Sequence, residues 1–265
     1  MNRTQIEWCQ NPDGTPGFTW NPITGCLNGC EYCYARRLAN TRLRERYLAN
    51  QNVATALRTR WGDKITDPFY PRFWPERFKD LSKRKQQLMD GEPKQMGVFV
   101  CDMSDLFGIG IPEDWTSQIM EAIWDNDEYD RFYLLTKQPQ NLIKWSPFPE
   151  NCYVGVTATN QKAHNEAVVA LSGIEASIKF ISHEPLLERI SLHDPYSPED
   201  AYNWDIIGSQ TKPYNPPRIE WVQEIISASD KAGIPVFLKD NLKPLIAEPG
   251  VVEVDEFELR QEMPE

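Results

Sequence analysis

The chain of 265 residues lacks any apolar run close to the roughly 20 residues that a membrane-spanning helix needs. Its N-terminal stretch, MNRTQIEWCQ, lacks the apolar core of a signal peptide. The chain also lacks low-complexity linkers and repeats of fixed short period. These absences predict a cytoplasmic protein without a membrane partner, in which thiols stay reduced. The six cysteines therefore indicate metal binding or buried packing, and not a disulfide framework.

An excess of positive charge is missing too, because the formal net charge is −11. This balance disfavours attraction of the whole surface to nucleic acid. The charge is uneven, however. Residues 36–60 hold seven arginines against one acid, Glu45, whereas residues 248–265 hold seven acids against Arg260. Two interpretations of the segment Arg36–Arg60 stay open: a contact for a nucleic acid or nucleotide, and an exposed helix with solvated arginines.

Short apolar segments rich in β-branched and aromatic residues alternate with amphipathic segments along the chain. This alternation predicts right-handed β-α-β units and a parallel sheet. Seven strands favour an α/β fold that forms a complete or nearly complete parallel (β/α) barrel. We expect a single domain over residues 1–265, with an insertion over 60–96 and an acidic C-terminal extension over 243–265. The expected strands are 18–23, 97–102, 131–136, 152–157, 177–182, 204–209 and 235–240. The expected helices are 32–50, 76–90, 113–126, 160–172 and 218–232, with a short one after residue 136.

Six of these strands run directly into polar residues. In a parallel barrel the chemistry takes place at the C-terminal ends of the strands. Six polar strand ends would surround that face with hydrogen-bonding and ionisable groups, so we expect the active site there. In chain order the residues are Asp102, Ser104, Asp105, Thr136, Lys137, Thr157, Ser182, His183, Glu184, Ser209, Gln210, Thr211, Lys239, Asp240 and Asn241.

The segment CLNGCEYC, residues 26–33, places Cys26, Cys30 and Cys33 on a loop between a strand and a helix. Three thiolates at this spacing can converge on one face of a [4Fe–4S] cluster. Such a cluster normally takes four cysteines, so one iron would remain for a non-protein ligand. Zinc is an alternative, although the spacing is not the usual pair of CxxC motifs. Its fourth ligand would come from Cys9, Cys101, Cys152 or a histidine. Three thiols without metal are a further alternative.

The same segment resembles the signature of the radical S-adenosylmethionine (SAM) enzymes, in which an aromatic residue usually precedes the third cysteine, as Tyr32 does here. The segments WNPITGCLNGCEYCYARRLA, DMSDLFG, LLTKQP, VGVT, SHEPLL, IIGSQT and GIPVFLKDNL occur in this order. Together they are similar to a radical-SAM-like family with a three-cysteine motif, found in phages and prophages and of unknown function. The resemblance covers residues 20–242.

This resemblance implies a barrel of the radical SAM type with a [4Fe–4S] cluster on the three cysteines. SAM would bind the fourth iron through its amino and carboxylate groups. One electron, from a flavodoxin- or ferredoxin-like donor, would cleave SAM to methionine and a 5′-deoxyadenosyl radical, which abstracts hydrogen from the substrate. The protein's own contribution would be orientation and exclusion of water.

The resemblance also suggests which residues bind the cofactor. Ser104 and Asp105, with Asp102 beside them, are expected near the SAM amino group, and Thr157 near the ribose hydroxyls. Buried acids or helix caps are the alternative for the residues that follow the second strand. The full expected cofactor-binding set is Tyr32, Asp102, Ser104, Asp105, Thr157 and Ser209.

Four residues are expected to be catalytic. Lys137, Glu184 and Lys239 would hold the substrate or the SAM carboxylate, or would form ion pairs with one another. His183 would donate a proton, with a buried core histidine as the alternative. His164 and His193 receive no role.

We therefore predict a radical SAM enzyme that acts on a nucleobase or nucleotide in phage DNA hypermodification, by isomerisation or rearrangement. The phage resemblance and the arginine-rich segment after the cysteine loop support this substrate. One alternative is radical SAM chemistry on a small metabolite or peptide, which the lack of a second cysteine cluster disfavours. The other is a non-catalytic, zinc-stapled nucleic-acid-binding protein.

Overall fold

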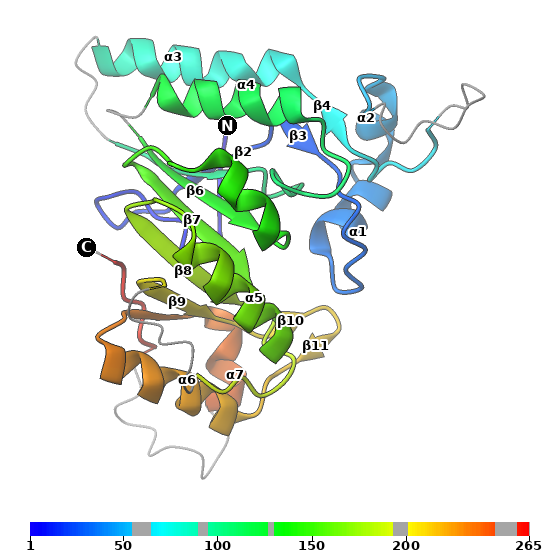
Figure 1. Ribbon diagram of the computed structural model, residues 1–265. Helices are drawn as coiled ribbons and strands as arrows, with labels where there is room; N and C mark the ends of the chain where they lie inside the picture. Colours follow the sequence, from blue (N-terminus) through cyan, green and yellow to red (C-terminus); the bar gives the residue numbers. More distant parts are fainter. Residues whose placement is uncertain (55–64, 90–94, 127–129, 193–200, 247–258, 265) are drawn as a thin grey trace. The chain divides into compact units, whose positions relative to one another are not determined.

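The computed structural model describes all residues except 55–64, 90–94, 127–129, 193–200, 247–258 and 265 (Figure 1). Arg58, Arg60, His193 and six of the seven acids of the C-terminal extension lie outside the described residues. The chain divides into two compact units. Unit 1 comprises Met1–Gln138 and Pro149–Cys152, and unit 2 comprises Pro139–Phe148 and Tyr153–Glu265. The single domain expected from the sequence stays a prediction.

Unit 1 contains a mostly parallel sheet in the order β1-β2-β5-β6. Strands β2, β5 and β6 run parallel, and β1 is antiparallel to β2. All four residues of β5, GVFV, are buried, as is usual for a parallel strand that is covered on both faces. The bounds are β1 (Asn2–Arg3), β2 (Phe18–Trp20), β5 (Gly97–Val100) and β6 (Arg131–Thr136).

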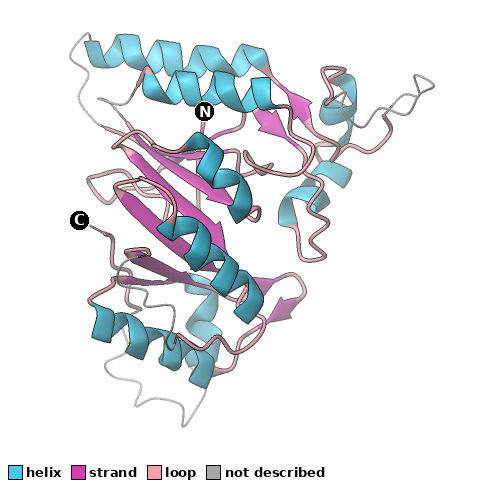
Figure 2. Ribbon diagram, viewed as in Figure 1, coloured by secondary structure: helices cyan, strands magenta, loops and turns pink. Residues whose placement is uncertain are grey.

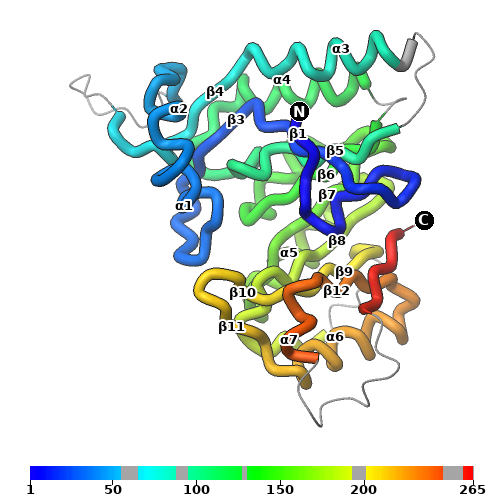
Figure 3. Tube along the Cα trace, turned by 180° about the vertical axis from the view of Figure 1, so that it is seen from behind, coloured from blue at the N-terminus to red at the C-terminus, as the bar shows by residue number. Residues whose placement is uncertain are grey.

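The helices of unit 1 include α3 and α4, which lie side by side in Figures 1 and 3. Lys85 of α3 donates to the carbonyl of Asp125 at the end of α4, at 2.8 Å. The bounds are α1 (Tyr34–Asn40), α2 (Arg44–Ala49), η1 (Pro75–Arg77), α3 (Phe78–Met89) and α4 (Glu113–Trp124). A small two-stranded antiparallel sheet consists of β3 (Ile23–Thr24) and β4 (Arg72–Phe73).

The continuous helix expected over 32–50 is wrong, because the structure breaks it into α1 and α2. The hydroxyl of Thr41 donates to the carbonyl of Arg37 at 2.8 Å, and the amide of Asn40 donates to the carbonyl of Arg36 at 2.8 Å. Such side-chain bonds compete with the backbone ladder and favour helix ends. The helix also starts late, because Cys33 caps it instead of belonging to it.

Unit 2 contains four parallel strands in the order β7-β8-β9-β12 (Figure 2). Helix α5 connects β7 to β8, and α6 precedes β12. The strands are β7 (Cys152–Thr157), β8 (Ile178–His183), β9 (Trp204–Ile207) and β12 (Val236–Leu238), with a hairpin of β10 (Gln210–Thr211) and β11 (Tyr214–Asn215). The helices are η2 (Pro139–Trp145), α5 (Gln161–Ser172), α6 (Ile219–Ala232), η4 (Asp240–Leu242) and α7 (Lys243–Ile246).

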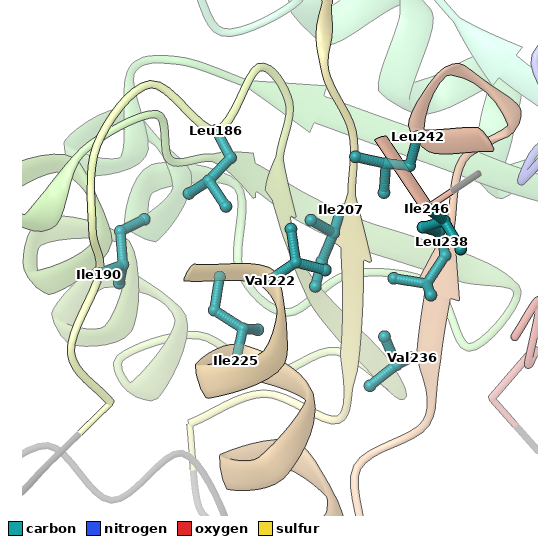
Figure 4. Packing of buried hydrophobic residues seen from close by; sticks show 9 residues of the cluster. All are labelled: Leu186, Ile190, Ile207, Val222, Ile225, Val236, Leu238, Leu242 and Ile246. Carbon is teal, nitrogen blue, oxygen red and sulfur yellow. The ribbon is translucent and has the colours of Figure 1, made fainter. Parts of the chain in front are cut away.

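The core of unit 2 forms where the apolar face of α6 packs on β9 and β12 (Figure 4). Val222 and Ile225 of α6 meet Ile207, Val236 and Leu238 of these strands. Each such side chain stabilises the fold by about 1.5–3 kcal/mol when it is fully buried. The remaining members of the cluster are Leu186, Ile190, Leu242 and Ile246.

The seven expected strands are confirmed as β2, β5, β6, β7, β8, β9 and β12, so the mostly parallel α/β fold is confirmed as well. Barrel closure stays a prediction. The second edge of β12 is occupied by the end of the chain, because the N–H of Leu238 donates to the carbonyl of Arg260 at 2.7 Å. Among the described helices, none is long and apolar enough to cross a membrane.

Candidate active site

The three-cysteine loop lies in unit 1 between β3 and α1. Cys26, Cys30 and Cys33 are all half-buried. The Sγ of Cys26 accepts a hydrogen bond from the N–H of Asn28 at 3.3 Å, and the Sγ of Cys33 accepts one from the N–H of Arg36 at 3.3 Å. The backbone therefore fixes the directions of two of the three sulfurs.

This donor set fits a cubane cluster better than a single metal ion. Within the described part of the chain, no three His, Cys, Asp or Glu side chains could hold one ion, as a zinc site requires. In a cubane each thiolate binds a different iron, so the sulfurs need not converge on one point. Hydrogen bonds from backbone N–H groups to sulfur are among the contacts that tune such clusters.

Burial, with a smaller contribution from the nearby charge of Asp105, raises the pKa of the Cys26 thiol to about 12. Without a metal this thiol is therefore protonated at neutral pH. A bound metal centre deprotonates a coordinating thiol, so assembly of such a centre at this loop would release a proton.

Asp105 connects the loop to the ends of β5 and β6, and its side chain is buried. One carboxylate oxygen accepts from the hydroxyl of Thr136 at 2.7 Å and from the N–H of Phe107 at 3.2 Å. The other accepts from the N–H of Lys137 at 2.9 Å and from the side-chain amide of Asn28 at 2.7 Å. Because these four donors surround both oxygens, Asp105 positions the cysteine loop.

Ser104 also contacts the loop backbone. Its hydroxyl donates to the carbonyl of Gly25 at 2.6 Å, and the N–H of Gly25 donates to the carbonyl of Met103 at 2.9 Å. Gly25 has a φ of +86°, and a Cβ there would lie 2.4 Å from the carbonyl oxygen of Tyr70. Only glycine fits this position directly before Cys26.

Asp102 lies beside the loop and is less completely occupied. Its carboxylate accepts hydrogen bonds from the amide of Asn21 and, at 3.1 Å, from the hydroxyl of Tyr34, the residue that follows Cys33. Burial raises the pKa of Asp102, and these hydrogen bonds lower it by a smaller amount. Asp102 is thus a carboxyl group of perturbed acidity held against the start of α1.

Tyr32 and Lys137 are brought together in unit 1. The Nζ of Lys137 lies 5.7 Å from the centroid of the Tyr32 ring, a cation–π distance. The next residue, Gln138, donates through its side chain to Oδ1 of Asn28 at 3.1 Å. The end of β6 therefore holds the cysteine loop at two points, and the ammonium group of Lys137 lies over the aromatic ring.

In unit 2, the ends of β8, β9 and β12 bring together three of the expected residues. Lys239 and Glu184 form an ion pair, the alternative that the sequence left open. The backbone of Ser209 exchanges two hydrogen bonds with the side chain of Asn241, at 2.9 and 3.0 Å. The hydroxyl of Ser209 is buried and has no hydrogen-bond partner within the described chain. Thr157 is buried at the end of β7.

His183 lies at the end of β8 but faces the helices of unit 2. Its Nε2 is 3.0 Å from Oδ1 of Asp205, whose other oxygen accepts from the hydroxyl of Ser229 of α6 at 2.8 Å. Its ring stacks on His164 of α5, with 5.6 Å between centroids. Both His183 and Asp205 are fully buried. This is the environment of a core histidine, so we do not include His183 in the proposed site.

Four side chains that sequence reasoning missed support the site: Asn21, Asn28, Tyr34 and Gln138. Asn28 and Tyr34 lie within or next to the cysteine motif, so their position in the sequence was a signal. Asn21 and Gln138 contact the site through partners 81 and 110 residues away, and no local pattern marks such contacts.

The fold and the loop define a class: a mostly parallel α/β protein with a three-cysteine loop suited to an iron–sulfur cluster. Within that class, the chain belongs to the family described as "Protein of unknown function (DUF5131)", whose model matches residues 3–243. No curated protein sequence matches the chain significantly. The phage association implied by the resemblance stays a prediction.

Solved structures of spore photoproduct lyase are similar in fold. One variant has a TM-score of 0.50 and 13% identity, and the match covers 86% of this chain and 78% of that one. A complex with dinucleoside spore photoproduct has a TM-score of 0.45 and 15% identity, and covers 86% and 56% of the two chains. A variant with bound AdoMet and the same dinucleoside has a TM-score of 0.46 and 14% identity, and the match covers 86% of this chain and 65% of that one. This chain thus spans little more than half of the first complex, and the likeness shows the fold alone.

Proposed function

We propose that this protein is a radical SAM enzyme whose [4Fe–4S] cluster is held by Cys26, Cys30 and Cys33. The observation that carries the proposal is the loop itself. Three half-buried thiols, two with backbone N–H donors, lie on the loop between β3 and α1, which Asp105 holds through Asn28. Three thiolates leave one iron of a cubane for SAM. When bound, the cluster and SAM supply one-electron cleavage of the sulfonium and a carbon radical that abstracts hydrogen.

The residues of unit 1 then have distinct roles. Ser104 and Asp105 position the loop, because their polar atoms are already bonded to Gly25 and Asn28. Asp102 is the carboxylate that remains to accept a hydrogen bond from the SAM amino group. Tyr32 and Lys137 form a pair that shields the loop on the side of β6.

The residues of unit 2 keep the roles expected from the sequence. The unpartnered hydroxyl of Ser209 supports a contact with a ligand. Thr157 is proposed for the ribose, and the Glu184–Lys239 pair for a carboxylate of substrate or SAM. If a ligand separated this pair, each of the two charges would lose its partner, which is costly for charges that are largely buried. We therefore expect only an anionic group to displace Glu184 from Lys239.

The proposed substrate is a nucleobase or nucleotide, with isomerisation or rearrangement of a substituent as the reaction, as in phage DNA hypermodification. The exposed arginines of α1 and α2, directly after the cysteine loop, support this substrate class. Neither the metabolite or peptide alternative nor the zinc-stapled alternative has a specific contact in its favour among the described residues.

Anaerobic reconstitution with iron and sulfide tests the proposal. We expect a broad visible absorbance that dithionite bleaches, about four irons per chain, and formation of 5′-deoxyadenosine from SAM. Cys26→Ala, Cys30→Ala and Cys33→Ala should each abolish SAM cleavage. Cys152→Ala is the matched control, because this thiol is fully buried at the start of β7 and should leave both readouts unchanged. Full cleavage of SAM by all three loop variants would refute the proposal that this protein is a radical SAM enzyme.

A further inference from the structure

Trp74 of unit 1 carries two guanidinium groups on its ring. The Cζ of Arg77 lies 4.2 Å from the indole, and the Cζ of Arg46, from α2, lies 5.7 Å from it. Trp74 is buried, and its Nε1 donates to the hydroxyl of Thr24 at 2.8 Å. The ring of Tyr47 packs beside it at 5.9 Å. The indole is therefore a fixed platform that orients both arginines.

The two charges on this platform are not neutralised by a direct ion pair with a described residue, although Glu76 and Asp102 lie close enough to Arg77 to interact with it electrostatically. In the part of the chain that the structure describes, neither Arg46 nor Arg77 forms an ion pair, whereas Arg44 pairs with Glu45. Arg77 donates to the neutral carbonyl of Asn21 at 2.6 Å. Burial lowers the pKa of Arg77, and the charge of Arg46 lowers it further. A bound anion would relieve this repulsion.

The platform belongs to the same packed core as the cysteine loop. Tyr47 and Trp74 form one cluster of buried side chains with Phe69 and Met103, and Cys26 and Cys33 pack against that cluster. A group bound at Trp74 is thus held rigidly relative to the loop within unit 1.

We propose that Arg46 and Arg77 bind a phosphate of a nucleic-acid backbone. Guanidinium groups match phosphate through paired N–H donors, and stacking on an aromatic ring holds them in place. Arg37 and Arg42 are also exposed in the same arginine-rich segment, so the surface offers repeated positive charge. Repeated charge suits a polymer of phosphates better than one free phosphate. The inference rests on the proposed function for its meaning, because it names the substrate class.

The test uses the reconstituted full chain and a fluorescein-labelled single-stranded oligodeoxynucleotide, with binding followed by anisotropy over a range of salt. Arg46→Gln should weaken binding about tenfold, the loss expected for one charged hydrogen-bonded contact. It should also lower the slope of log affinity against log salt by about 0.7, the value for one phosphate of a single strand. Arg44→Gln is the matched control, since it removes the same charge from the same helix but from an existing ion pair.

Two further arms make the result decisive. Arg46→Lys keeps the charge and loses the planar fork, so it should keep the salt slope and weaken binding. Thymidine 5′-monophosphate in excess should compete poorly with the oligonucleotide. Full competition would show that the platform binds the phosphate of a free nucleotide, and it would overturn the proposed contact with a nucleic-acid backbone. Equal losses of slope in Arg46→Gln and Arg44→Gln would show diffuse attraction and overturn the site.

The outcome is separable from that of the proposed function, because binding is measured without SAM. A protein that binds the oligonucleotide through Arg46 but never cleaves SAM refutes the enzyme and leaves the phosphate site standing. A protein that cleaves SAM but shows no binding that depends on Arg46 refutes the phosphate site and leaves the proposed enzyme standing.

Discussion

Replacing Asp105 by asparagine tests how the protein holds its cysteine loop. The two side chains have the same shape, but the amide supplies one acceptor oxygen where the carboxylate supplies two. One carboxylate oxygen of Asp105 faces the N–H of Phe107, and the other faces the N–H of Lys137. Whichever way the new amide turns, its NH₂ group meets one of these backbone donors.

The expected cost follows from this geometry. A buried backbone N–H without an acceptor costs about 1–3 kcal/mol, and a lost bond to a charged group lies at the upper end. We therefore expect Asp105→Asn to lower the free energy of unfolding by about 2–3 kcal/mol. Asp114→Asn is the control, because Asp114 is exposed in the first turn of α4 and should cost less than about 1 kcal/mol.

Urea denaturation at neutral pH measures both variants, and release of iron to a chelator measures the loop. Asn28→Ala removes the side chain through which Asp105 and Gln138 contact the loop and leaves the backbone donors of Asp105 in place, so it should speed the release of iron while it changes stability little. Equal stabilities of Asp105→Asn and Asp114→Asn would refute the role of Asp105 as a buried connector. Unchanged release of iron from Asn28→Ala would refute its connection to the cysteines.

Two further predictions concern pH and the loop backbone. Burial lowers the pKa of His164 from 6.5 to about 3, so unfolding takes up a proton between these pH values. Stability should therefore fall as pH drops below 6.5, and His164→Gln should remove up to one proton from that dependence in urea titrations over pH; equal slopes would contradict this. Gly25→Ala should lower iron content and thermal stability more than Gly29→Ala. Both glycines have positive φ, but only at Gly25 would a Cβ meet backbone atoms, so similar losses would contradict the steric argument.

The sequence predicted the fold to the extent that its patterns are local. The strands predicted from apolar runs such as GVFV and RFYLLT are confirmed. A strand that is buried on both faces requires continuous apolar residues, and such a run is visible in the sequence. The two-residue strands β1, β3, β4, β10 and β11 could not be predicted, since so few residues show no period. The break between α1 and α2 depends on side-chain bonds of Asn40 and Thr41, which the helical period of the segment concealed.

The candidate site was predicted in kind more than in detail. The spacing of the cysteines marks the loop because three thiols this close in sequence can reach one cluster from a single loop. His183 follows an apolar strand like the other candidates, but the alternation of side chains along β8 turns it towards α5 and α6. A position after a strand therefore does not establish which way a side chain faces.

The same reasoning separates the residues that bind from those that position. Asp102 and Asp105 are three residues apart, and the sequence placed both near the expected SAM amino group. Each oxygen of Asp105 accepts two hydrogen bonds from unit 1, whereas Asp102 accepts one on Oδ1 from Asn21 and one on Oδ2 from Tyr34, with a further contact from Thr19. A carboxylate that is already saturated cannot accept a ligand without breaking the contacts that place the cysteines, so under the proposed function we expect a direct contact with SAM from Asp102 and not from Asp105. Replacement of Asp102 should then affect SAM binding before it affects iron content, and replacement of Asp105 should affect them in the opposite order.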